Sequence, residues 1–195
     1  MVVTHLFNAL GFVAMEPPTA FTAEALHAEK QRVFDALQPL DPDRVNRGHY
    51  EGYLDIDGVA EGSDTETMVA LEARLDTPRW DGVPIYLRTG KRMAVGRRVI
   101  TLELEHPPMG MFDGRVAQGN RLTFEVGEPG HIRVGFNAKA PGPAMTLGHA
   151  HMDYDYDKSF EPRGELEAYE RLQHDAMLDD HMLFNPAEGN DLGVH

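Results

Sequence analysis

The chain has 195 residues, of which 42% are hydrophobic and 26% are charged, and its formal net charge is −14. So acidic a chain argues against general nucleic-acid binding, which needs a basic surface to neutralise phosphates, and against docking on anionic membranes. The absence of cysteine excludes disulfides, thiolate metal ligands and a cysteine nucleophile. No apolar run approaches the roughly 18 residues that span a bilayer. We therefore expect a cytoplasmic protein with no membrane partner.

The N-terminal part is predicted to be helical. Residues 1–15 are apolar on most sides, which predicts a helix covered on most sides, and Pro17 and Pro18 end it. A second helix is expected to start after Thr22, whose hydroxyl suits the N-cap, and to end at Pro39 and Pro42.

The middle of the chain changes to strand patterns. Alternating or short apolar runs cover 65–75, 83–88, 98–105, 122–126, 131–136 and 145–156. A last helix is predicted from about 164 to 178. This order of elements predicts an α+β fold with a large, mostly antiparallel sheet covered by helices on one face. The domain is expected to span 1–184, and 185–195 is expected to be a disordered tail.

Several short segments form a family signature in chain order. They are Ala14-Met15-Glu16-Pro17-Pro18, Arg47-Gly48-His49-Tyr50, Ser63-Asp64-Thr65-Glu66-Thr67, Arg79 to Lys91, Phe136-Asn137-Ala138-Lys139, Met152-Asp153-Tyr154 and Glu167 to Leu172. Together they resemble the C-terminal domain of bacterial-type glucose-6-phosphate dehydrogenase, over about residues 1–184. The resemblance implies glucose metabolism through the pentose phosphate pathway, NADP as the family cofactor, a sugar-phosphate ligand, and a homo-oligomer formed through the sheet.

Two features of that family are missing from this sequence. It has no strand–GxGxxG–helix unit to bind a dinucleotide, and no His-Tyr-Leu-Gly-Lys segment, near which the family has its catalytic histidine. We therefore expect no cofactor and no dehydrogenase activity for this chain alone. Three interpretations stay open: a non-catalytic binding and assembly domain, one half of a split enzyme completed by a separate NADP-binding chain, or a repurposed small enzyme or metal protein acting on an anionic metabolite.

The resemblance suggests that Lys91 binds substrate. Lys91 follows Gly90 and matches the family lysine that reaches the sugar phosphate. Glycine permits close backbone approach, and an ammonium attracts an anion. The alternative is a solvated lysine at a strand end. The segment from Arg47 to Ile56 is a polar loop or short strand whose glycines and aromatic residues also suggest close backbone approach.

Two arginines add weaker candidates. Arg97 lies in the basic cluster around Lys91 and is a second substrate-binding candidate, with internal salt bridges as the alternative. Arg88 matches an arginine that contacts a structural NADP in some relatives; it is the cofactor-binding candidate, and a carboxylate partner is the alternative. Glu125 stands where relatives have an arginine, which reverses the charge near any bound phosphate.

A separate group of residues suits a divalent metal. In an extended strand His149, His151 and Asp153 project from one face, together with Asp155 and Asp157. Imidazole and carboxylate ligands suit Zn, Ni or Mn. The alternative is simply the polar outer face of a sheet.

Overall fold

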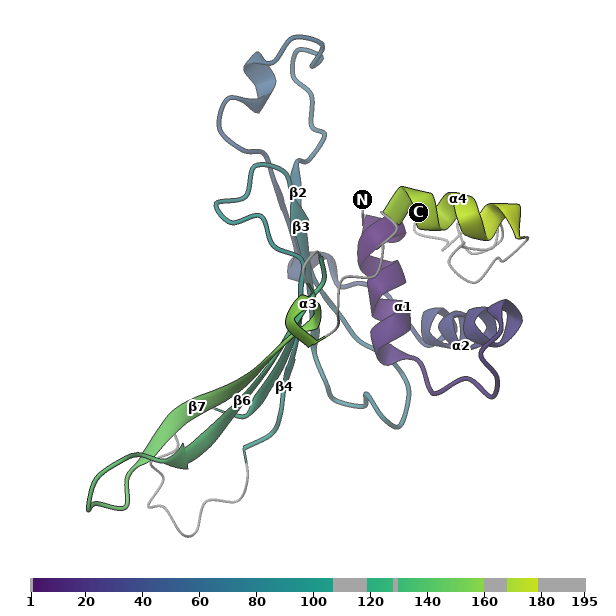
Figure 1. Ribbon diagram of the computed structural model, residues 1–195. Helices are drawn as coiled ribbons and strands as arrows, with labels where there is room; N and C mark the ends of the chain where they lie inside the picture. Colours follow the sequence, from purple (N-terminus) through teal and green to yellow (C-terminus); the bar gives the residue numbers. More distant parts are fainter. Residues whose placement is uncertain (1, 107–118, 128–129, 160–167, 179–195) are drawn as a thin grey trace. The chain divides into compact units, whose positions relative to one another are not determined.

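The computed structural model describes residues 2–106, 119–127, 130–159 and 168–178 (Figure 1). The chain forms two compact units: the first is Met1–Met93 with Leu166–His195, and the second is Ala94–Glu165. The predicted tail at 185–195 and the start of the last helix lie outside the described residues.

Two helical segments open the first unit. A π-helical turn, η1 (Val2–Phe7), continues into α1 (Asn8–Ala14), and α2 (Ala23–Asp35) follows. The predicted N-cap is confirmed, because the Thr22 hydroxyl accepts a hydrogen bond from the Ala25 backbone N at 3.3 Å. α2 ends at Asp35, before Pro39 is reached.

Helix α1 is covered on most sides. Leu10, Gly11 and Ala14 are buried, Asn8, Ala9 and Val13 are half-buried, and Phe12 is 42% exposed. The predicted cover on most sides is therefore confirmed for this helix. Because Gly11 has no side chain, α2 can pack closely against α1: a Cβ at Gly11 would lie only 3.2 Å from the Phe34 ring.

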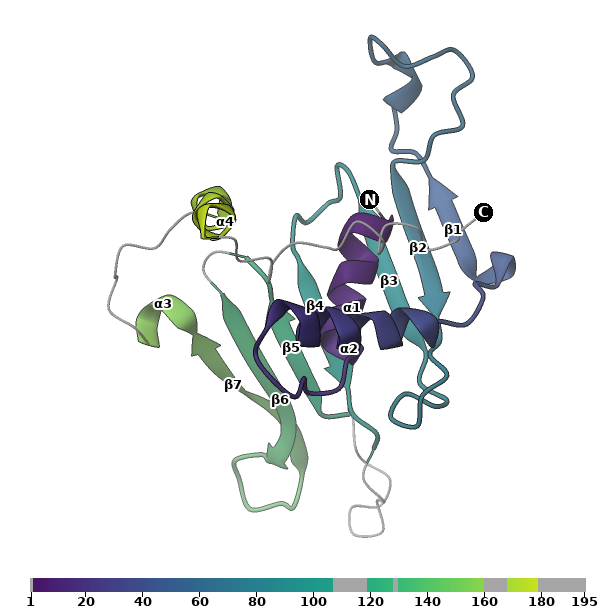
Figure 2. The same ribbon diagram turned by 90° about the vertical axis from the view of Figure 1, so that its right-hand side faces the viewer.

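A three-stranded antiparallel sheet completes the first unit. Its strands, in the order β1-β2-β3, are β1 (Val45–Gly48), β2 (Met68–Ala73) and β3 (Ile85–Gly90). Short 3₁₀ turns lie at Pro42–Arg44 and Tyr53–Asp55. Burial alternates along β2 as predicted, and α1 and α2 lie on one face of this sheet (Figure 2). The buried hydrophobic side chains of the described residues are Phe7, Leu10, Ala14, Leu26, Val33, Val69, Leu71, Ala73 and Leu75.

The second unit is a four-stranded antiparallel sheet in sequential order. Its strands are β4 (Val99–Glu103), β5 (Arg121–Glu125), β6 (His131–Lys139) and β7 (Leu147–Asp155), and the short helix α3 (Tyr156–Ser159) follows. Helix α4 (Ala168–Met177) returns to the first unit. The α+β, antiparallel class is confirmed. Among the described helices, none has the length and apolar character to cross a membrane.

The hydrogen bonds divide the strands into two sheets instead of one large sheet. Residues 91–98, between β3 and β4, are not in a strand, and Arg92 adopts a left-handed backbone conformation with φ +52°. A left-handed residue interrupts a regular strand.

The four-stranded sheet has one apolar and one polar face. Residues opposite one another in neighbouring strands point to the same side. One face carries the rows Ile100, Phe124, Ile132, Tyr154 and Leu102, Leu122, Val134, Met152. The other carries Val99, Glu125, His131, Asp155, then Thr101, Thr123, Arg133, Asp153, then Glu103, Arg121, Gly135, His151.

Candidate functional site

Lys91 lies directly after β3, and a hydrogen bond holds its backbone in place. Its backbone N donates to the Thr67 carbonyl at 2.9 Å, and its side chain is exposed. Within the described ranges its ammonium has no ion-pair partner. Gly90 beside it is closely packed, because a Cβ there would lie 2.8 Å from Met93 Sδ and 3.1 Å from Met68 Cγ. Among the residues that the structure describes, Lys91 is thus a cation without a neutralising carboxylate at the end of a strand.

Thr67 holds the backbone around Lys91. It is only 4% exposed, and all three of its polar groups are used. Its N–H donates to the Gly48 carbonyl at 2.9 Å, its hydroxyl accepts from the Tyr50 N–H at 3.0 Å, and its carbonyl accepts from Lys91. The sequence carries no signal that separates Thr67 from Thr65, so sequence reasoning missed it.

An aromatic cluster occupies the loop after β1. The ring centroids of Tyr50 and Tyr53 are 5.5 Å apart, edge to face, and those of His49 and Tyr53 are 5.3 Å apart. The Arg92 guanidinium carbon lies 4.7 Å from the centre of the Tyr50 ring, a cation–π distance. The glycines and aromatics at 47–56 were the only sequence signal for this arrangement.

The two arginine candidates have different surroundings. Arg88 is exposed on β3, opposite Ala70, and has no carboxylate partner within the described ranges. Arg97 belongs to the second unit and donates to both Glu125 oxygens, at 2.9 and 2.7 Å. Through these hydrogen bonds Arg97 lowers the pKa of Glu125, and Glu125 raises the pKa of Arg97. Arg97 is thus neutralised, and it falls in a different unit from Lys91.

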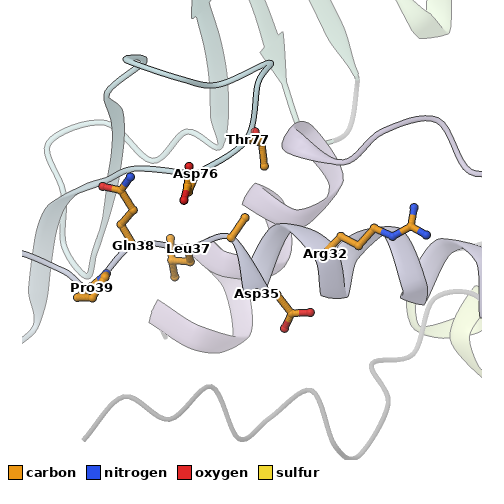
Figure 3. A pocket seen from close by; sticks show the side chains of 8 residues that line it. Arg32, Asp35, Leu37, Gln38, Pro39, Asp76 and Thr77 are labelled. Atoms are coloured by element: carbon orange, nitrogen blue, oxygen red, sulfur yellow. The ribbon is translucent and has the colours of Figure 1, made fainter.

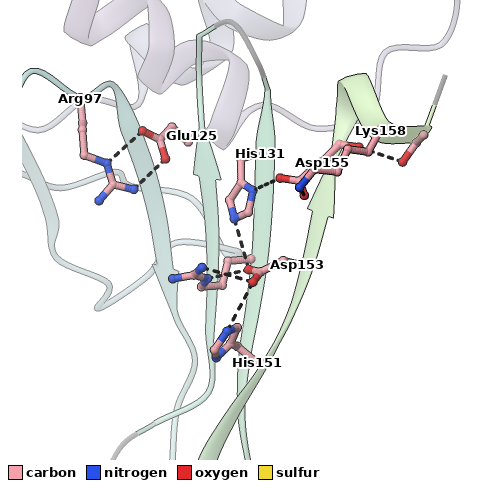
Figure 4. A network of polar contacts seen from close by, with 9 residues as sticks. Arg97, Glu125, His131, His151, Asp153, Asp155 and Lys158 are labelled. Atoms are coloured by element: carbon pink, nitrogen blue, oxygen red, sulfur yellow. Dashed lines mark hydrogen bonds and ion pairs between the residues drawn. The ribbon is translucent and has the colours of Figure 1, made fainter. Parts of the chain in front are cut away.

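Two of the three predicted metal residues, His151 and Asp153, lie in a network of ion pairs on the polar face of the second sheet (Figure 4). Asp153 accepts from Arg133 Nε at 2.6 Å and contacts His131 and His151 at 3.2 and 3.3 Å. The Nδ1 of His131 also lies within hydrogen-bonding distance, 2.8 Å, of Asp155 Oδ1. The Arg133 guanidinium lowers the pKa of Asp153.

This network gives the metal hypothesis no support. The ring of His149 lies against Gly135, where a Cβ would be 2.9 Å from Nε2. Asp157 lies in α3, outside the strand, so its expected place on the strand face is wrong. In the described segments no group of three or more His, Asp or Glu side chains could hold a metal ion.

A pocket lies between the C-terminal end of α2 and the segment after β2 (Figure 3). Arg32 pairs with Glu29 and Asp35 accepts from Gln31, whereas the carboxylate of Asp76 has no side-chain partner among the described residues. The hydroxyl of Thr77 is buried there without a hydrogen-bond partner among the described residues. The cation of this lining is thus already paired with Glu29, so the pocket does not offer it to an anionic ligand.

Comparison with known proteins identifies the domain. The family model described as "Glucose-6-phosphate dehydrogenase, C-terminal domain" matches residues 1–191. Glucose-6-phosphate 1-dehydrogenase 1 of Mycobacterium tuberculosis is 37% identical to this chain over 187 residues, and glucose-6-phosphate 1-dehydrogenase of Rhizobium meliloti is 36% identical over 201 residues. Both matches cover 94% of this chain but only 39% and 40% of the relatives' length.

Solved structures agree with these matches. The crystal structure of glucose-6-phosphate 1-dehydrogenase from Mycobacterium avium superimposes with a TM-score of 0.86 at 32% identity. A glucose-6-phosphate dehydrogenase in complex with its substrate glucose-6-phosphate superimposes with a TM-score of 0.89, also at 32% identity. Each match covers 98% of this chain and 41% of the solved chain.

The two antiparallel sheets and their helices thus define an α+β domain. The chain belongs to the glucose-6-phosphate dehydrogenase family and corresponds to its C-terminal domain. It spans about two fifths of the length of the relatives that it matches.

Proposed function

We propose that this chain is the substrate-side and assembly part of a glucose-6-phosphate dehydrogenase, and that it does not oxidise the sugar by itself. The observation that carries the proposal is Lys91, whose ammonium is exposed and, within the described ranges, not paired with a carboxylate. In a chain of net charge −14, a cation without such a partner attracts anions locally. A phosphate monoester is the ligand that such an ammonium suits.

The assembly part of the proposal rests on the apolar face of the second sheet. Val134, Met152 and Tyr154 on that face are 36%, 60% and 40% exposed. A contiguous exposed apolar patch marks an interaction surface. We propose that a second copy of the chain covers it, which gives a homo-oligomer formed through the sheet.

The proposed lack of activity rests on what hydride transfer requires. The reaction needs a nicotinamide held against the sugar carbon and a base for the hydroxyl proton. Every strand pair in the described ranges is antiparallel, so these residues contain no βαβ unit that could hold NADP. Exposed Arg88 alone does not form a dinucleotide site. A separate NADP-binding chain in the cytoplasm that completes the enzyme is the alternative.

Calorimetric titration with glucose 6-phosphate tests the substrate-side claim. We expect saturable heat from the wild-type chain, loss of that heat in Lys91→Ala, and no change in the control Lys158→Ala, since Lys158 pairs with Asp155 in the second unit. Absence of heat at millimolar ligand would contradict the claim. Glucose 6-phosphate with NADP⁺ should give no NADPH; NADPH formation would contradict the proposed lack of activity.

Light scattering after size-exclusion chromatography tests the assembly claim. Met152→Glu places a charge on the apolar face and should shift the oligomer toward monomer. Thr101→Glu places the same charge on the polar face and serves as the matched control. A wild-type monomer, or equal effects of the two variants, would contradict assembly through the apolar face.

A further inference from the structure

The aromatic loop and Lys91 leave the same end of the first sheet. The pairing register aligns Gly48, Met68 and Gly90 across the three strands. The loop that begins at His49 therefore follows β1 at the edge where Lys91 follows β3. Gly48 and Gly90 flank Met68 in this row, and the side chains of Met68 and Met93 pack against Gly90.

One buried residue fixes both segments. Thr67 accepts a hydrogen bond from the Tyr50 N–H on its hydroxyl and another from the Lys91 N–H on its carbonyl. Arg92, the next residue, reaches back to the Tyr50 ring. The loop and the strand end are thus joined by a backbone contact and by a side-chain contact.

The chemistry of the two segments is complementary. Lys91 offers a positive charge without an ion-pair partner in the described part of the chain. Tyr50 and Tyr53 offer partly exposed rings and two hydroxyl groups. Aromatic faces pack against the C–H groups of a ring, and phenol hydroxyls bond polar groups at its edge.

We propose that Tyr50 and Tyr53 form a second wall of the Lys91 site and recognise the sugar of a phosphorylated sugar, while Lys91 recognises its phosphate. This inference rests on the proposed substrate-side function. It adds that the selectivity for a sugar phosphate over phosphate alone lies in the loop after β1.

NMR titrations with glucose 6-phosphate and with inorganic phosphate separate the two roles. Tyr53→Ala should raise the Kd for glucose 6-phosphate about fivefold, the order expected for one lost aromatic contact, and leave the Kd for phosphate unchanged. Lys91→Ala should weaken both ligands. Tyr86→Ala is the matched control, because Tyr86 lies on β3, is 73% exposed and has no part in the cluster.

A second pair of variants tests the proposal independently, in case Tyr53→Ala unfolds the loop locally. Thr67→Val removes the hydroxyl that holds Tyr50 but keeps the side-chain shape, whereas Thr67→Ser keeps the hydroxyl. Thr67→Val should lose affinity for glucose 6-phosphate selectively, and Thr67→Ser should retain it. Circular dichroism spectra should stay close to wild type in both, and the loss of one hydrogen bond should lower the melting temperature of Thr67→Val by only a few degrees.

The outcomes are distinguishable. Suppose that the wild-type chain binds glucose 6-phosphate through Lys91. If Tyr53→Ala and Thr67→Val then bind glucose 6-phosphate as tightly as wild type, or lose affinity for both ligands equally, the proposed role of Tyr50 and Tyr53 is wrong and the proposed function stands. If the wild-type chain binds neither ligand, the proposed function fails and this inference fails with it.

Discussion

Trp80, the one tryptophan of the chain, links the segment after β2 to the end of α1. Its Nε1 donates to the Ala14 carbonyl at 3.0 Å, and its ring packs against the core cluster that includes Phe7 and Leu10. The carbonyl of Ala14 is one of the last four carbonyl groups of the helix, and these groups accept no hydrogen bond from within the helix. Trp80→Phe keeps an aromatic ring and removes the donor.

We expect Trp80→Phe to cost about 1 kcal/mol of unfolding free energy, the net value of a neutral hydrogen bond. For a chain of this size that lowers Tm by about 3 °C. Far-UV circular dichroism is the suitable probe, because the variant has no tryptophan fluorescence. Trp80→Leu also shrinks the packed surface and should cost about 1–2 kcal/mol more. A Trp80→Phe variant as stable as wild type would refute the role of the hydrogen bond, and equal losses in both variants would refute the packing argument.

Three further predictions concern the cap, the strand end and the ion-pair face. Thr22→Ala removes the N-cap of α2 and should cost about 1 kcal/mol in thermal unfolding, with Thr19→Ala as a neutral control. Gly90→Ala forces a Cβ against Met93 and Met68 and should cost about 1 kcal/mol; Gly96→Ala, where a Cβ meets nothing within 4 Å, should not. Arg133 holds the pKa of Asp153 below its ordinary value, so the folded state binds this proton less readily than the unfolded state. Stabilisation should be complete above about pH 5 and fall away as the pH drops below about 4. In melting experiments at a series of pH values, Asp153→Asn should reduce the fall in melting temperature below about pH 4. An unchanged fall would contradict the role given to the Asp153–Arg133 pair.

Local patterns predicted the elements well. The alternation around Val69 and Leu71 matches the burial pattern of β2, and Thr22 does cap α2. These features depend on residues a few positions apart, which periodicity and capping rules describe directly. The family signature also pointed to the correct domain.

Contacts between distant residues were beyond those rules. Arg97 and Glu125 are 28 positions apart and come into contact because Glu125, the last residue of β5, pairs with Val99 at the start of β4, two residues after Arg97. The sequence suggested that Glu125 reverses the charge near a phosphate, whereas in the structure it neutralises an arginine. The role of Thr67 likewise depends on three strand ends meeting, and the division into two sheets depends on which strands pair, which local patterns do not specify.

The sequential strand order has a kinetic consequence. Each strand that the structure describes pairs only with its neighbour along the chain, so none of these pairings requires a segment that is distant in sequence. The connections at 126–130 and 140–146 are the shortest between paired strands, so the entropy lost in closing them is smallest. The β5–β6 and β6–β7 hairpins should therefore form before the β1–β2 and β4–β5 pairs, whose connections are longer. The strand β4 can then add to the β5–β6–β7 sheet that has already formed. The first unit, built from two separate stretches of chain, should be completed later.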